Sequence, residues 1–198
     1  LVQRGIKALV VACNTASATA LDALAQEFAP LPVFGVVEPG AAAACAAADA
    51  SGVTVLATES TIAGGAYQRA LLRSQSTLRV LGRPCPLWVT LAEQGGVAST
   101  LSDAILLDGV SGLTQSPVST TLPSTLLLGC THFPVFRDPL QRLLGDGVRV
   151  IDSAQTTAST VAAALTELGL ASAHGGKTVF LATDGVARFQ RVGAVFMG

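Results

Sequence analysis

Charged residues are scarce in this chain of 198 residues, making up only 13% of it, and the formal net charge is −1. The twelve Lys and Arg residues are scattered rather than clustered, so there is no electrostatic basis for binding nucleic acid or an anionic membrane surface. No apolar run approaches the roughly 20 residues that a membrane-spanning helix needs. We therefore expect neither nucleic acid nor a membrane as the main partner.

The four cysteines and two histidines show no spacing typical of a metal site or a disulfide framework. There is no Cys-x-x-Cys or His-x-x-x-His pattern, and His132 and His174 lie far apart in sequence, so we expect no metal. Unpaired cysteines without an export signal are typical of the reducing cytoplasm, which is the location we expect. Half of the residues are hydrophobic, which lets a chain of this length bury one or two cores.

Strand-like runs alternate with helix-like segments, a pattern typical of parallel βαβ units and an α/β fold. Asp152 with Gln155 predicts a capped helix start, and the apolar spacing that follows predicts a helix. Residues 113–124, rich in Ser, Thr and Pro, indicate a surface loop. The expected strands are Ala8–Ala12, Val33–Val37, Val53–Ala57, Leu78–Leu81, Thr125–Leu128, Val148–Ile151 and Thr178–Ala182.

Two places in the chain indicate crossings between domains. Glu38-Pro39-Gly40 breaks the pattern before an alanine-rich helix over 41–50, and a return crossing is expected near Ile151-Asp152-Ser153. The prediction is a discontinuous first α/β domain, residues 1–37 and 152–198, and a second α/β domain, residues 38–151.

Two cysteines occupy near-duplicate settings. Leu9-Val10-Val11-Ala12-Cys13-Asn14-Thr15 and Leu126-Leu127-Leu128-Gly129-Cys130-Thr131-His132 each run from an apolar strand through one small residue to a cysteine and two polar residues. Ligands of open α/β sheets gather at the carboxyl ends of the strands, where helix N-termini favour anions and thiolates. A lone cysteine is most often a small buried hydrophobe. The matched settings instead favour two thiols that face one substrate.

The residues around both cysteines resemble the aspartate/glutamate racemase family, and glutamate racemase in particular. The two signatures are Ala12-Cys13-Asn14-Thr15-Ala16-Ser17-Ala18 and Leu128-Gly129-Cys130-Thr131-His132-Phe133-Pro134. The resemblance covers essentially the whole chain. Supporting matches follow in the expected order, at Gly35–Gly40, Ala57–Ile62 with Tyr67, Cys85–Val89, Leu91–Gly95 and Ile151–Ser153.

The resemblance implies two Rossmann-like domains with parallel-rich sheets, an active site in the cleft between them, no cofactor and glutamate as a small-molecule substrate. It implies that Cys13 and Cys130 are acid and base on opposite faces of the substrate α-carbon, assisted by Glu93 and His132. The implied substrate-binding residues are Asn14, Thr15, Thr58, Thr61, Thr131 and His132. Two simpler alternatives remain open. Thr58 and Thr61 could simply cap the helix that follows their strand. Glu93 could be a carboxylate in the first turn of a helix, stabilised by the helix dipole.

The function that this resemblance implies is the interconversion of L- and D-glutamate, which supplies D-glutamate for peptidoglycan synthesis in cell wall biogenesis and cell shape. Family motifs that precede the first cysteine are not found, which predicts a chain without its N-terminal segment, a first domain that is incomplete, and weak or no activity for this piece alone. The alternatives are a racemase for aspartate or another acidic amino acid, and a catalytically inactive binding or regulatory fragment. The family also makes a homodimer a possible assembly.

Overall fold

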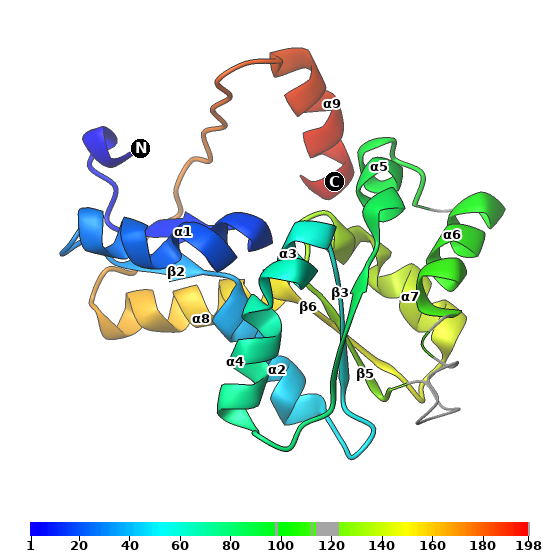
Figure 1. Cartoon of the computed structure of the whole chain (residues 1–198). Helices are drawn as coiled ribbons and strands as arrows, with labels where there is room; N and C mark the ends of the chain where they lie inside the picture. Colours follow the sequence, from blue (N-terminus) through cyan, green and yellow to red (C-terminus); the bar gives the residue numbers. More distant parts are fainter. Residues whose placement is uncertain (98, 112, 114–122, 198) are drawn as a thin grey trace.

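The computed structural model describes residues 1–97, 99–111, 113 and 123–197 (Figure 1). Within them the strands form two parallel sheets, one of two strands and one of four in the order β4-β3-β5-β6. Chain order reverses between β3 and β5, so the carboxyl ends of these two strands flank the position where ligands bind in open α/β sheets. The strands are β1 (Leu9–Val11), β2 (Val33–Gly35), β3 (Val53–Ala57), β4 (Val80–Pro84), β5 (Thr125–Leu128) and β6 (Arg149–Asp152).

The two central strands are buried on both faces, since helices cover both sides of the four-stranded sheet. Side chains alternate along a strand, so Leu126 and Leu128 of β5 join one apolar cluster and Leu127 joins the other. Both faces of the strand must then be apolar, which explains the continuous hydrophobic runs. One cluster includes helices α2 (Val37–Ala47) and α4 (Ala66–Ser74), and the other includes α5 (Pro86–Glu93), α6 (Thr100–Ser111) and α7 (Arg137–Leu144).

The remaining helices connect the two sheets or extend from them. The short segments are η1 (Val2–Arg4), α3 (Glu59–Gly64) and η2 (Phe133–Phe136), and the longer helices are α1 (Asn14–Glu27), α8 (Ser153–Glu167) and α9 (Val186–Met197). Helix α8 packs against α2, whereas α9 contacts α5. Figure 1 shows the segment between α8 and α9 arching away from the two-stranded sheet to place α9 beside α5. Within the described part of the chain, no helix is both long and apolar enough to cross a membrane.

The predicted α/β class with parallel sheets is confirmed, but several predicted boundaries shift. The strand predicted at Val33–Val37 ends at Gly35, because α2 already begins at Val37 and takes in Glu38-Pro39-Gly40 as its first turn. Proline is tolerated there, since N–H groups of a first helical turn have no partner within the helix. The strand predicted at Leu78–Leu81 lies at Val80–Pro84, paired with the whole of β3.

One predicted strand is wrong. Residues 178–182 form no regular structure, and Val179, Phe180 and Leu181 are 70%, 58% and 49% exposed. A strand exists only when neighbouring backbone groups pair with it, and none of the described strands does so here. The apolar pattern alone could not reveal that. Residues 114–122 of the predicted surface loop lie outside the described residues.

Candidate functional site

The two cysteines lie at the ends of strands in two different sheets. Cys13 follows β1, precedes the first turn of α1 and is exposed, whereas Cys130 follows β5 and is 6% exposed. Burial raises the pKa of Cys130, the backbone N–H groups of His132 and Thr131 oppose that shift, and the charge of Cys13 adds to it. The two cysteine turns also meet directly, since Thr131 hydrogen-bonds to the carbonyl of Ala12. Backbone donors are placed to stabilise the Cys130 thiolate.

A chain of polar contacts leads away from Cys130. The Nδ1 atom of His132 lies 3.8 Å from the Cys130 sulfur, and its Nε2 atom lies 3.2 Å from a carboxylate oxygen of Glu93. The other oxygen of Glu93 forms an ion pair with Arg188 of α9. The hydrogen bond from Arg188 is the main cause that lowers the pKa of Glu93. An imidazole held between a carboxylate and a thiol can tune that thiol or carry a proton to or from it.

Glu93 is the last residue of α5, so the alternative interpretation as a first-turn carboxylate is wrong. A negative charge at a helix C-terminus interacts unfavourably with the helix dipole. Arg188 and His132 compensate for this placement. Glu93 lies at the unfavourable end of α5, and its two oxygens contact His132 and Arg188. A role at this site explains this placement better than stabilisation of α5 does.

Three threonine hydroxyls meet beside the Cys13 turn. The Thr15 Oγ1 atom lies 3.0 Å from that of Thr61 and 3.4 Å from that of Thr58. Thr58 also caps α3 by accepting a hydrogen bond of 3.3 Å from the Thr61 backbone N–H, so the capping interpretation is right for this residue. A hydroxyl can donate and accept at once, so a capping threonine can still bind a ligand.

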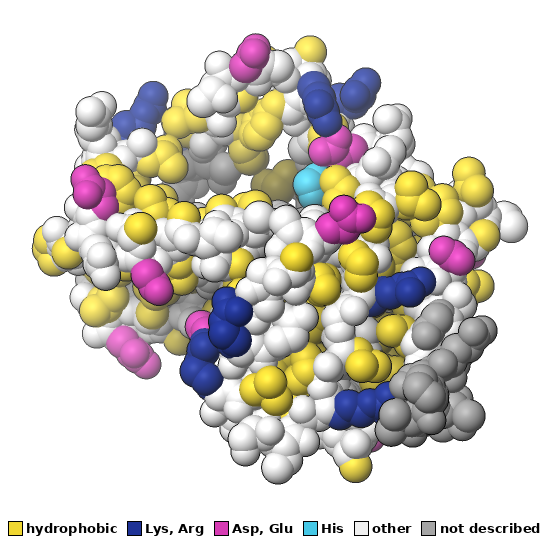
Figure 2. All heavy atoms as spheres, in the orientation of Figure 1, with side chains coloured by type: hydrophobic (Ala, Val, Ile, Leu, Met, Phe, Trp, Pro, Cys, Tyr) yellow, Lys and Arg dark blue, Asp and Glu magenta, His cyan; other side chains and the backbone are white. Residues whose placement is uncertain are grey.

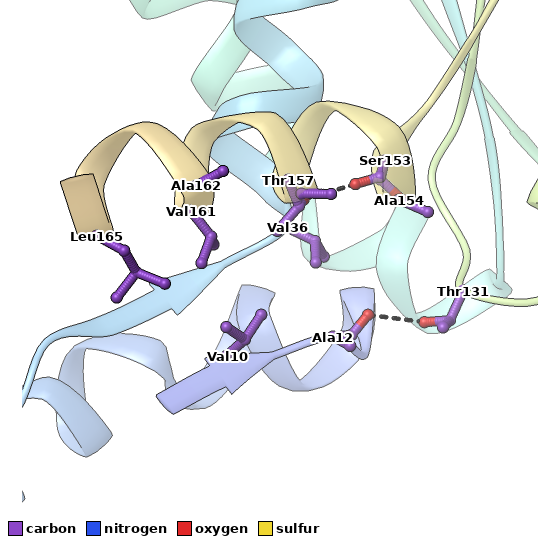
Figure 3. Close-up of a pocket in the computed structure, with 11 residues that line it drawn as sticks. Val10, Ala12, Val36, Thr131, Ser153, Ala154, Thr157, Val161, Ala162 and Leu165 are labelled. Atoms are coloured by element: carbon purple, nitrogen blue, oxygen red, sulfur yellow. Dashed lines mark hydrogen bonds between the residues drawn. The ribbon is translucent and has the colours of Figure 1, made fainter. Parts of the chain in front are cut away.

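The side chains of Asn14 and Thr131 make contacts within the protein. Asn14 is 2% exposed, accepts a hydrogen bond of 2.5 Å from the Tyr67 hydroxyl, and directs its Nδ2 atom to Ser153 at 3.4 Å. Thr131 donates a hydrogen bond of 2.8 Å to the carbonyl of Ala12, which ties the two cysteine turns together (Figure 3). This bond lies at the edge of an apolar pocket of about 410 Å³ between β1 and α8.

Comparison with known proteins places the chain in a family. Residues 1–161 match the family described as Asp/Glu/hydantoin racemase. The chain belongs to this family. It is 42% identical to the glutamate racemase of Geobacter metallireducens over 100% of this chain and 72% of that protein, and 36% identical to that of Lactiplantibacillus plantarum over 100% and 71%.

Solved structures of family members agree. The glutamate racemase of Thermus thermophilus in complex with beta-chloro-D-alanine is 34% identical with a TM-score of 0.82, covering 100% of this chain and 71% of that one. The Francisella tularensis enzyme in complex with D-glutamate is 26% identical with a TM-score of 0.85, covering 99% and 71%.

The racemase signatures do not extend to α9, so sequence reasoning missed two residues of this helix that reach the site. Besides the Arg188 ion pair, the Phe196 ring packs edge-on against His132 with centroids 5.8 Å apart, and it contacts the cluster that contains Cys130. A usable signal was present. Apolar residues recur at helical spacing at Phe189, Val192 and Phe196, after the dipeptide Asp184-Gly185, which is typical of a turn. Figure 2 shows the surface hollowed between α1 and this C-terminal segment.

Proposed function

We propose that this protein is a glutamate racemase that interconverts L- and D-glutamate without a cofactor, with Cys13 and Cys130 as the two acid/base groups. The observation that carries the proposal is that the cysteine turns after β1 and β5 meet: Thr131, next to Cys130, donates a hydrogen bond of 2.8 Å to the carbonyl of Ala12, next to Cys13. The relatives and solved structures named glutamate racemase support the choice of substrate.

Inverting a stereocentre by proton exchange requires a base on one face of the carbon and an acid on the other. One cysteine, as the thiolate, removes the α-proton, and the other, as the thiol, delivers a proton to the opposite face; the first ends protonated and the second ends as a thiolate. A free thiol has a pKa of about 8.5, which lets both forms exist near neutral pH.

The substrate α-proton is much less acidic than a thiol, so the site must stabilise the carbanion-like transition state. In this proposal, Glu93 and His132 orient and tune the Cys130 side, where the two form a hydrogen bond of 3.2 Å. The substrate-binding groups are those of Asn14, Thr15, Thr58, Thr61, Thr131 and His132. The threonine hydroxyls, which meet within 3.4 Å of one another, supply donors and acceptors for carboxylate and amino groups.

Serine variants of the protein test the mechanism. Cys13→Ser and Cys130→Ser preserve the size of the side chain but replace the thiol with a much weaker acid, so each should lower kcat by roughly 10²-fold or more. Circular dichroism of glutamate, starting from either enantiomer, measures racemisation. Cys45→Ser, which changes a half-buried cysteine of α2, is the matched control and should keep wild-type activity.

The same assay separates the alternatives. Faster turnover of aspartate than of glutamate would replace the proposed substrate. If the wild type binds glutamate but racemises neither amino acid, a binding or regulatory role replaces catalysis. If both serine variants stay within tenfold of wild type, the two-cysteine mechanism is refuted.

We also propose a cellular role, a location and an oligomeric state for this activity. Racemisation of glutamate would supply D-glutamate to peptidoglycan synthesis from the cytoplasm, where free thiols persist. Sedimentation equilibrium tests the expected homodimer.

A further inference from the structure

The only tyrosine of the chain, Tyr67, connects the two cysteine turns. Its side chain is 0% exposed and extends from α4 beneath both turns. The hydroxyl donates a hydrogen bond of 2.5 Å to Oδ1 of Asn14, the residue that follows Cys13. The ring lies against Gly129, the residue that precedes Cys130, so closely that a Cβ atom there would be 2.8 Å from the ring carbon Cε2. One rigid side chain thus contacts the neighbour of each cysteine.

The same hydroxyl lies where the chain passes between the two sheets. It is 3.5 Å from the carbonyl of Val36, which joins β2 to α2. The Asn14 amide that it contacts lies 3.4 Å from the hydroxyl of Ser153, the first residue of α8. Burial raises the pKa of Tyr67, so the phenol stays protonated and remains a hydrogen-bond donor at physiological pH.

We propose that Tyr67 is a positioning residue for the proposed racemisation, fixing the Asn14 amide and the spacing of the Cys13 turn from the Cys130 turn. This inference rests on the proposed function. An asparagine amide has one oxygen acceptor and two N–H donors. A phenol that always donates to Oδ1 therefore fixes the orientation of the amide group. With Oδ1 held by Tyr67 and Nδ2 directed to Ser153, both ends of the Asn14 amide are fixed, and with them the turn that follows Cys13.

The Tyr67→Phe variant removes the hydroxyl and keeps the ring against Gly129. The loss of one hydrogen bond that orients a substrate-binding group should lower kcat/KM roughly tenfold, chiefly through a higher KM for glutamate. Leu71→Val is the matched control, because Leu71 is buried in the same cluster on the same helix and has no contact with Asn14 among those described. It should leave KM unchanged. Equal effects of the two variants, or a wild-type KM in Tyr67→Phe, would overturn the proposal.

A second measurement does not depend on activity or on the fold of the Phe variant. Because the chain has one tyrosine, growth on 3-fluorotyrosine labels Tyr67 alone with ¹⁹F. The single ¹⁹F signal should shift when Asn14 is changed to Ala, and shift again in the wild type when glutamate is added. A ¹⁹F chemical shift that is the same in Asn14→Ala and in the wild type refutes the positioning role. If the signal shifts in Asn14→Ala but the wild type shows no racemase activity, the Tyr67–Asn14 contact is supported and the proposed function is refuted.

Discussion

Replacing Arg188 by glutamine should shift the pH dependence of catalysis while barely changing stability. The Arg188 side chain is 68% exposed and that of Glu93 is 27% exposed, so solvent screens their ion pair. Such pairs contribute about 0.2–1 kcal/mol to the free energy of unfolding. For a domain of this size, the melting temperature should then fall by no more than about 4 °C.

The pH effect has a definite direction. Arg188 is the main cause that lowers the pKa of Glu93, so Arg188→Gln should let that pKa rise toward its ordinary value. If the Glu93 carboxylate must be charged to orient His132, the acid limb of the kcat/KM profile should move to higher pH. The stability that the depressed pKa contributes is present above the pKa of an unfolded Glu, about 4.3, and is lost as pH falls through the lower folded value.

Kinetics of glutamate racemisation between pH 4 and 8 provide the assay. Arg191→Gln is the control, because Arg191 is exposed on the same helix and takes part in none of the described ion pairs. It should reproduce the wild-type profile. An acid limb that is identical in Arg188→Gln, Arg191→Gln and wild type would refute the role assigned to the Glu93–Arg188 pair.

Three further predictions concern stability and thiol reactivity. Gly52→Ala should lower the free energy of unfolding by about 2 kcal/mol or more in urea titrations, because Gly52 has φ +92° and a Cβ there would lie 2.1 Å from the Arg79 carbonyl oxygen; an unchanged midpoint contradicts this. Asp152→Ala should lower the free energy of unfolding by about 1 kcal/mol, because it removes the α8 cap. Asp152→Asn should retain most of this stability, since asparagine also caps helices, and thermal unfolding measures the difference. Iodoacetamide followed by mass spectrometry should modify exposed Cys13 first and Cys85 last, since burial raises the pKa of Cys85 to about 12; the reverse order contradicts the described burial.

The sequence was most informative where one physical requirement dominates. Strands β3 and β5 were predicted at Val53–Ala57 and Thr125–Leu128 with the observed bounds, because burial on both faces demands an unbroken apolar run. The start of α8 was also predictable, since an Asp at the cap position accepts a backbone hydrogen bond from the first turn, here 2.8 Å from the Gln155 N–H. The positions of both cysteines after strands follow from the same reasoning.

Features that depend on contacts between distant segments could not be predicted. Nothing in the residues near Glu93 indicates that Arg188 will pair with it, and nothing near Asn14 points to Tyr67 as its donor. The wrong strand at Thr178–Ala182 has the same origin, because an apolar pattern does not say whether a partner strand lies alongside.

The unequal exposure of the two thiols has a consequence for the fate of the hydrogen that leaves the substrate. On Cys13 that hydrogen is held by a sulfur that water can reach, whereas on Cys130 it is held by a sulfur shielded from the solvent. Under the proposed mechanism, glutamate that carries deuterium at its α-carbon should therefore lose the label to water sooner when the reaction starts from one enantiomer than from the other.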